Sequence, residues 1–200
     1  MSTLTLPEGY ELILGSSSKS RAYILNKYNI PFRVVTQSID EKALGDRTGD
    51  PSALVLKIAH AKADALIASG KLPTTPAIVI CSDQVAVYAG VIREKPENEA
   101  EARHYLESYR SGPVETFGGV VVYNTATKKK AAVVDHAKQH FKYIPDDVID
   151  GLINAGRVFE CCGGFTIEDP YWLHTLGDGG DSIVGLSLTV VQRLIAETLV

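Results

Sequence analysis

The sequence of 200 residues has little of what marks disulfide-rich or membrane proteins. It contains 3 cysteines, and these form no CxxC pair, which favours free thiols over a disulfide framework. No apolar run approaches the roughly 20 residues that span a bilayer. Residues 1–9 hold no basic stretch followed by an apolar core. We therefore expect no signal peptide, no membrane partner and a cytoplasmic location.

Clustered basic charge is also missing. The chain has 20 Lys and Arg against 24 Asp and Glu, for a net charge of −4. Proteins that bind nucleic acid polymers concentrate basic residues on one surface, so we expect no such partner here. The one basic run, Lys128–Lys130, falls in an expected hairpin turn and is interpreted as a solvated tip. The apolar fraction of 45% is ordinary for a packed globular core.

Several motifs of well-known enzyme classes are absent. The sequence has no GxxxxGK[ST] loop and no protein-kinase signature set, which argues against a kinase-type phosphoryl transferase. It has no Gly-x-Ser-x-Gly elbow for acyl transfer and no HExxH zinc motif. We therefore expect structural or surface roles for the histidines, which are His60, His104, His136, His140 and His174.

Short apolar runs alternate with helical patterns, which predicts an α/β fold. Asp50 followed by Pro51 is a typical helix start, and Ala89-Gly90 fits a hairpin turn. We expect one domain over residues 1–200. The expected strands are Glu11–Leu14, Pro31–Val35, Ala77–Ile80, Glu115–Asn124 and Ala131–Tyr143, and the expected helices are 21–28, 52–69, 98–112, 145–155 and 187–200.

A serine-rich turn, Gly15–Ser18, separates the first strand from the first helix. Backbone N–H groups at such a turn, together with the positive end of the helix dipole, favour an anion. Ser16, Ser18 and Ser20 add hydroxyl groups, and the Arg21 guanidinium suits phosphate oxygens. Taken alone, the same residues also fit an ordinary polar turn with a solvated arginine.

Other candidates follow along the chain. Asp83 comes directly after the apolar run Ala77–Ile80, and we expect it at the carboxyl end of that strand, where ligands of open α/β sheets bind. An aspartate in a local turn is the other interpretation. Lys62 lies between small apolar residues of a helix, although a lysine that reaches solvent from a helix face looks the same.

Together these residues indicate triphosphate chemistry. Basic groups at Arg21, Lys62 and Lys95 would neutralise phosphate oxygens. Acidic groups at Glu41, Asp83 and Glu168 would hold a divalent metal and position water.

The same residues, in the same order, give the chain a resemblance to the Maf family of nucleotide pyrophosphatases. The resemblance extends from about Glu11 to Leu199, and seven motifs in register make it highly specific. In chain order the similar segments are Leu14–Arg21, Ile39–Glu41, Ala61–Ala63, Ser82–Val85, Glu94–Pro96, Gly164–Glu168 and Asp181–Leu186.

The resemblance implies a two-lobed α/β fold around a long mixed sheet, with flanking helices and a cleft between the lobes, as in inosine triphosphate pyrophosphatases. It implies cleavage of a nucleoside triphosphate to the monophosphate and pyrophosphate with Mg²⁺ or Mn²⁺, and a homodimer. By position, it implies catalytic roles for Asp83, Lys95, Lys62 and Glu41, metal binding by Glu41 and Asp83, and substrate binding by Ser16, Ser18, Arg21, Lys62 and Lys95.

Three departures from the family pattern concern Lys19, Ser20 and Ser187, which stand where the family has Pro, Arg and Pro. The family positions linked with substrate choice fall on Ser20, Gln84 and Glu168, and this combination resembles the branch that prefers 7-methyl-GTP. A carboxylate at Glu168 could accept hydrogen bonds from the N1–H and N2–H₂ edge of guanine, which a glutamine could match with only one oxygen. Another modified nucleotide or a pyrimidine triphosphate stays open as the substrate.

The loss of an arginine at Ser20 also supports a second hypothesis. The chain could be a non-catalytic, nucleotide-binding regulator of cell division or growth, as the family's description as septum formation inhibitors invites. The presence of Arg21, Lys62, Asp83 and Lys95 argues for the enzyme. Nucleotide binding without turnover would favour the regulator.

Overall fold

The computed structural model describes residues 4–165, 175–176 and 180–200, and Glu168 lies outside them. These residues form a mixed α/β fold with a seven-stranded sheet in the order β2-β1-β3-β5-β6-β7, with β4 paired to β3. The strands are β1 Glu11–Leu14, β2 Arg33–Val34, β3 Ala77–Tyr88, β4 Val91–Arg93, β5 Val114–Asn124, β6 Lys130–Phe141 and β7 Thr175–Leu176. The helices are α1 Lys19–Lys27, α2 Pro51–Ala68, α3 Glu99–Ser108, α4 Asp146–Ala155, α5 Gly180–Val184 and α6 Leu188–Leu199, with short 3₁₀ turns η1 Glu41–Ala43, η2 Arg157–Glu160 and η3 Cys162–Gly164.

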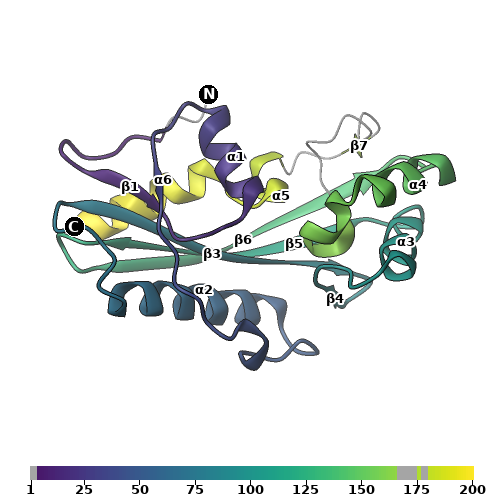
Figure 1. The fold of residues 1–200 in the computed structure, drawn as a ribbon, viewed down its shortest axis with the longest axis horizontal. Helices are drawn as coiled ribbons and strands as arrows, with labels where there is room; N and C mark the ends of the chain where they lie inside the picture. The colour runs from purple at the N-terminus through teal and green to yellow at the C-terminus, as the bar shows by residue number, and fades with distance from the viewer. Residues whose placement is uncertain (1–3, 166–174, 177–179) are drawn as a thin grey trace. The chain divides into compact units, whose positions relative to one another are not determined.

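The chain divides into two compact units. The first comprises residues 1–83, 118–135 and 185–200, and the second comprises residues 84–117 and 136–184. In the first unit, β1 pairs in parallel with both β2 and β3, with Leu14 opposite Val34 and Ile80. Helix α2 covers one face of this part of the sheet, and α1 and α6 cover the other (Figure 1).

The core of the first unit follows from its apolar runs. Strands β1 and β3 are fully buried at Ile13 and Val79, as expected for parallel strands covered on both faces. Helix α2 packs its buried stripe, which includes Ala59 and Ala63, against this layer. The approach is close because a Cβ at Gly119 of β5 would lie 2.4 Å from the carbonyl oxygen of Val55. The packing of α2 on β5 therefore requires glycine at that position.

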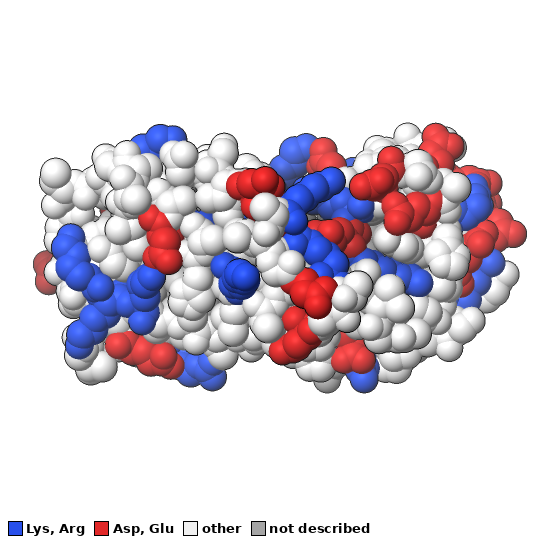
Figure 2. Space-filling view, turned by 90° about the horizontal axis from the view of Figure 1, so that it is seen from below, with Lys and Arg blue, Asp and Glu red and all other residues white. Residues whose placement is uncertain are grey.

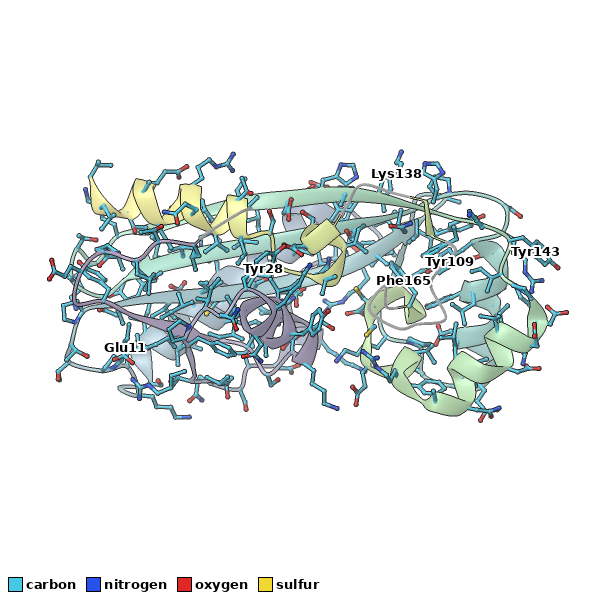
Figure 3. All side chains as sticks on the ribbon, turned by 90° about the horizontal axis from the view of Figure 1, so that it is seen from above. Glu11, Tyr28, Tyr109, Lys138, Tyr143 and Phe165 are labelled. Carbon is cyan, nitrogen blue, oxygen red and sulfur yellow. The ribbon has the colours of Figure 1, made fainter. Side chains whose placement is uncertain are left out.

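The second unit has a core of its own, rich in aromatic rings. Tyr109 is 1% exposed and makes edge-on contacts with Tyr88 at 5.5 Å and Phe165 at 5.7 Å between ring centroids. Figure 3 shows Tyr109 and Phe165 directed toward each other in this core. The chain turns sharply beside them at Gly163, where φ is +70°. Helix α3 contacts α4 and the η3 turn.

Most boundaries agree with the sequence predictions because local capping signals set them. Asp50 caps α2, with Pro51 in its first turn. Asn98 accepts a hydrogen bond from the Glu101 N–H at the start of α3, and Gly156 ends α4 in the left-handed conformation. Ser187 caps α6 by accepting from the Val190 N–H. This departure from the family pattern therefore places a favoured capping residue at the helix start.

Two strand predictions are wrong. Strand β2 covers only Arg33–Val34 of the expected Pro31–Val35. Strand β3 does not end at Ile80 but continues to Tyr88, so Asp83 lies within the strand and not beyond its carboxyl end. The strand continues because its tertiary pairing overrides the turn-like sequence Ser82–Gln84. It pairs with β1 up to Ile80 and with β4 from Ala86 onward, and β5 is a further hydrogen-bonded neighbour in the sheet.

Charged side chains of both signs lie interspersed on the face drawn in Figure 2. Among the described residues, no helix combines the length and the apolar character needed to cross a membrane.

Candidate functional site

Three of the expected residues meet in the first unit. The Lys62 Nζ atom lies 2.8 Å from Asp83 Oδ1 and 2.9 Å from Glu41 Oε2, so one ammonium bridges two carboxylates. The side chains of Lys62 and Asp83 are 16% and 13% exposed, whereas that of Glu41 is 47% exposed. Two of these groups are thus well shielded from water, and the third stands open to solvent.

Each of the three comes from a different element. Lys62 projects from α2, whose position is fixed by the close contact at Gly119. Asp83 belongs to the long strand β3, and Glu41 opens the short turn η1. A helix, a central strand and a loop therefore converge on one ammonium group. The sequence predicted that these three residues meet, although Asp83 was expected at the carboxyl end of its strand and lies within it.

The serine-rich turn is held by bonds within itself. Ser16 Oγ accepts hydrogen bonds from the Ser18 N–H at 3.2 Å and from the Arg21 guanidinium at 3.0 Å. Ser18 caps α1 by accepting from the Arg21 N–H at 3.4 Å. Lys19, which stands where the family has proline, is the first residue of α1, a position that proline also favours. The N–H groups of Ser18 and Arg21 and the Arg21 guanidinium were expected to be available to an anion, but they already form hydrogen bonds within the turn.

Arg21 is buried rather than open to solvent. It is 8% exposed, and its Nε donates to the Gly185 carbonyl at 3.2 Å while another nitrogen donates to Ser16. The guanidinium therefore ties the serine-rich turn to the segment that precedes α6. The guanidinium also brings its positive charge to the turn through its contact with Ser16.

The Cys81 side chain packs against Gly15 of the same turn. A Cβ at Gly15 would lie 2.4 Å from Cys81 Sγ, so the cysteine occupies the space that a larger residue at position 15 would need. Burial raises the pKa of the Cys81 thiol to about 12, while the nearby charges of Lys62 and Arg21 act in the opposite direction.

Lys95 belongs to the second unit, on a short segment that is fixed at both ends. Lys95 itself is exposed, whereas its neighbour Pro96 is buried. The carbonyl of Glu94 accepts a hydrogen bond from the Gly163 N–H at 3.0 Å. The backbone that presents Lys95 is therefore anchored while the side chain stays accessible.

Arg93 anchors the same segment and was missed by the sequence analysis. It is 6% exposed, and its guanidinium carbon lies 4.5 Å from the ring centroids of Tyr88 and Tyr105 and 5.2 Å from that of Tyr109. One nitrogen also donates to Ser108 Oγ at 2.6 Å. The tyrosines come from two separate places, because Tyr88 ends β3 whereas Tyr105 and Tyr109 lie one turn apart at the end of α3, so no single local pattern predicts this cage.

The residues expected to govern substrate choice lie in different settings. Gln84 uses its amide nitrogen to donate to the Ser182 carbonyl of α5 at 3.0 Å, so it holds the backbone of that helix. Ser20 is half-buried in the first turn of α1. The prediction for Glu168 falls outside the described residues.

The remaining sequence predictions concern cysteines and histidines. The structure has Cys161 and Cys162 partly exposed and Cys81 buried, and all three are free thiols, as the sequence favoured. His136 lies on strand β6, where it stacks on Phe117 at 4.4 Å and contacts Glu115 at 2.6 Å. It therefore has the surface role that was expected.

A divalent cation suits the donors that meet at Lys62. Glu41 and Asp83 supply hard carboxylate oxygens, and they already converge on one positive charge. The described part of the chain contains no group of three or more His, Cys, Asp and Glu side chains that could hold a metal alone. Mg²⁺ is commonly bound by one or two carboxylates together with substrate phosphates, so two protein ligands fit that mode.

Comparison with known proteins identifies the family. Residues 11–198 match the family described as Maf-like protein. The chain is 44% identical to the 7-methyl-GTP pyrophosphatase of Dictyostelium discoideum, over 93% of this chain and 96% of the relative. It is 32% identical to the 7-methyl-GTP pyrophosphatase of Pseudoalteromonas translucida (strain TAC 125), over 94% and 92%. It is 29% identical to the nucleoside triphosphate pyrophosphatase of Synechococcus sp. (strain JA-3-3Ab), over 93% of each. The chain belongs to the Maf family.

Proposed function

We propose that this protein is a nucleoside triphosphate pyrophosphatase that cleaves 7-methyl-GTP to the monophosphate and pyrophosphate. The observation that carries the proposal is the Lys62 ammonium bridging Asp83 and Glu41 at 2.8 and 2.9 Å. Family membership and the names of the relatives support the same reaction. The choice of 7-methyl-GTP rests on two of those relatives and on the residues at Ser20, Gln84 and Glu168.

The basic residues would stabilise negative charge, and Asp83 would accept a proton. Lys62, Arg21 and Lys95 would offset the negative charge of the phosphate oxygens. Asp83 would orient a water molecule and accept its proton as the water oxygen bonds to phosphorus. The anhydride bond between the α- and β-phosphates breaks, and pyrophosphate leaves with the electron pair.

Lys62 would also keep Asp83 in place. Its ammonium bonds to Oδ1, which leaves Oδ2 for the water. Glu41 and Asp83 are the residues that would hold Mg²⁺ or Mn²⁺, and the bound ion would polarise the phosphate oxygens. The serine-rich turn would then position the phosphate chain through Ser16 and Ser18, whose oxygens already order the turn.

A nucleotide panel tests the proposal. We expect metal-dependent release of pyrophosphate from 7-methyl-GTP, with a higher kcat/KM than for GTP, CTP, UTP or TTP. Pyrophosphate and orthophosphate are measured separately, with and without Mg²⁺. Release of orthophosphate alone would contradict the proposed bond cleavage, and binding without turnover would indicate a nucleotide-binding regulator.

Glu168 provides the test of substrate choice. A carboxylate there would accept two hydrogen bonds from the guanine edge, so Glu168→Gln should reduce the preference for guanine-type nucleotides by about tenfold. The measurement is the ratio of kcat/KM values across the panel. An unchanged ratio would exclude this role for Glu168. The homodimer stays a prediction from the family resemblance, and the cytoplasmic location stays a prediction from the sequence.

A further inference from the structure

Arg47 sits at the centre of the loop that carries Glu41. Its guanidinium donates to the carbonyl oxygen of Glu41 at 2.7 Å, to that of Leu44, and to that of Lys42 at 3.4 Å. These carbonyls lie in and just after the η1 turn. The Glu41 carbonyl also accepts from the Leu44 N–H at 3.2 Å, so Arg47 adds a second hydrogen bond there and bonds to two further carbonyls at the end of the turn.

The other contacts of the loop are polar or involve single residues. No residue of η1 is buried, so hydrophobic packing does not fix this turn. Asp40 caps the turn by accepting from the Ala43 N–H at 3.3 Å. Gly45 adopts a φ of +75° and a Cβ there would lie 2.4 Å from Leu54 Cδ1 of α2, and the Glu41 carboxylate contacts Lys62 of the same helix. The hydrogen bonds from Arg47 therefore act directly on the backbone of the turn.

The position of Glu41 matters because its carboxylate meets Lys62 from a half-exposed site. A loose η1 turn would let that carboxylate move away, whereas Lys62 and Asp83 sit on a helix and a strand and would stay together. Resting on the proposed function, we infer that Arg47 is a positioning residue that holds Glu41 at the reaction centre. It acts on the backbone of Glu41 and not on the substrate.

The substitution that tests this is Arg47→Met, which keeps most of the side-chain length and removes every donor. We expect kcat/KM to fall about tenfold, the scale on which outer partners of ligating residues act. In combination with Glu41→Gln, the loss should be no larger than that of Glu41→Gln alone, because Arg47 acts only through Glu41. Arg193→Met, which removes an exposed arginine from α6, is the matched control and should leave kcat/KM unchanged.

A second readout does not depend on turnover. In Arg47→Met, trypsin should cut after Lys42 about tenfold faster than in the wild type or in Arg193→Met, because local opening exposes the bond. Mn²⁺ binding without nucleotide, followed by electron paramagnetic resonance, should weaken in Arg47→Met and in Glu41→Gln alike.

The outcomes separate the two proposals. Wild-type cleavage after Lys42 in Arg47→Met would overturn the role of Arg47, whatever the activity. Losses that multiply in the double variant would also overturn it, because Arg47 would then act independently of Glu41. A wild-type protein that releases no pyrophosphate would instead overturn the proposed function, and the tryptic cleavage would still decide whether Arg47 holds the loop.

Discussion

Each unit holds a cation that is largely shielded from water, but the two cations are surrounded by different groups. In the first unit, Lys62 lies between the carboxylates of Asp83 and Glu41. In the second, Arg93 lies against three tyrosine rings and bonds to neutral oxygens. A lysine between partly exposed carboxylates can exchange partners with an incoming phosphate or metal. An arginine enclosed by aromatic rings stabilises the fold instead. Shielding of a charge from water therefore does not by itself identify a reaction centre.

The largest effect should come from removing the cation of the first unit. Lys62→Met leaves two carboxylates facing each other and removes a contact to phosphate, so kcat/KM for pyrophosphate release should fall about 100-fold or more. Lys57→Met on the exposed side of the same helix should change it less than about twofold. Near wild-type turnover in Lys62→Met would remove the distinction between the two cations.

Two glycines of the second unit test how tightly its core is built. Gly163→Ala should lower the free energy of unfolding by about 2–3 kcal/mol, because φ is +70° and the new Cβ would lie 2.7 Å from that of Ala86. Gly151→Ala lies within α4 with nothing nearby and should raise it by about 0.5–1 kcal/mol. Urea unfolding measures both, and equal effects would contradict the packing around Gly163.

Removing the cation of the second unit should affect stability and spare the chemistry. Arg93→Met gives up three ring contacts and the bond to Ser108, which we expect to cost about 2 kcal/mol. Turnover per folded molecule should stay within about threefold of the wild type. Arg103→Met, which breaks only an exposed pair with Asp150, should change stability by less than about 1 kcal/mol. A 100-fold loss of turnover in Arg93→Met would assign this cage to the reaction centre.

The last effect is absent near neutral pH and appears only at alkaline pH. Burial raises the pKa of the Cys81 thiol from 9.0 to about 12 in the first unit, and raises the pKa of Tyr105 from 10.0 to about 12 in the second. The folded chain therefore keeps protons that the unfolded chain releases. This stability is complete below about pH 9 and is lost as pH rises toward 12. Unfolding in urea from pH 8 to 11 should show the decline, and Cys81→Ala should remove the part that begins near pH 9.

The sequence was sufficient wherever local chemistry decides structure. The caps at Asp50 and Asn98 and the turn at Ala89-Gly90 located helix starts and a hairpin correctly. It failed at β3, because that strand has β1, β4 and β5 as hydrogen-bonded neighbours, and these partners together carry it through polar residues. Strand pairing depends on segments far apart in the chain, and a local pattern does not contain it.

The site shows the same division. Lys62, Glu41 and Asp83 could be identified from residue type and family position, and the structure places them within bonding distance. Arg47 and Arg93 were not identified. The carbonyls that Arg47 contacts are close to it in the chain, but residue types alone do not show that a turn aligns them, and the rings around Arg93 come from both β3 and α3. Arg21 was predicted to bind phosphate, which stays a prediction, and its burial and its bond to Gly185 were not foreseen.

The rate of pyrophosphate release from 7-methyl-GTP by Asp83→Asn, at saturating Mg²⁺, tests the central claim most directly. The side chain keeps its shape and loses its charge, so kcat/KM should fall by about two orders of magnitude or more while the protein stays folded. Asp64→Asn, an exposed aspartate on α2 that pairs with Lys130, is the matched control and should retain wild-type turnover. Wild-type turnover in Asp83→Asn would contradict the assignment of Asp83, Lys62 and Glu41 as the reaction centre.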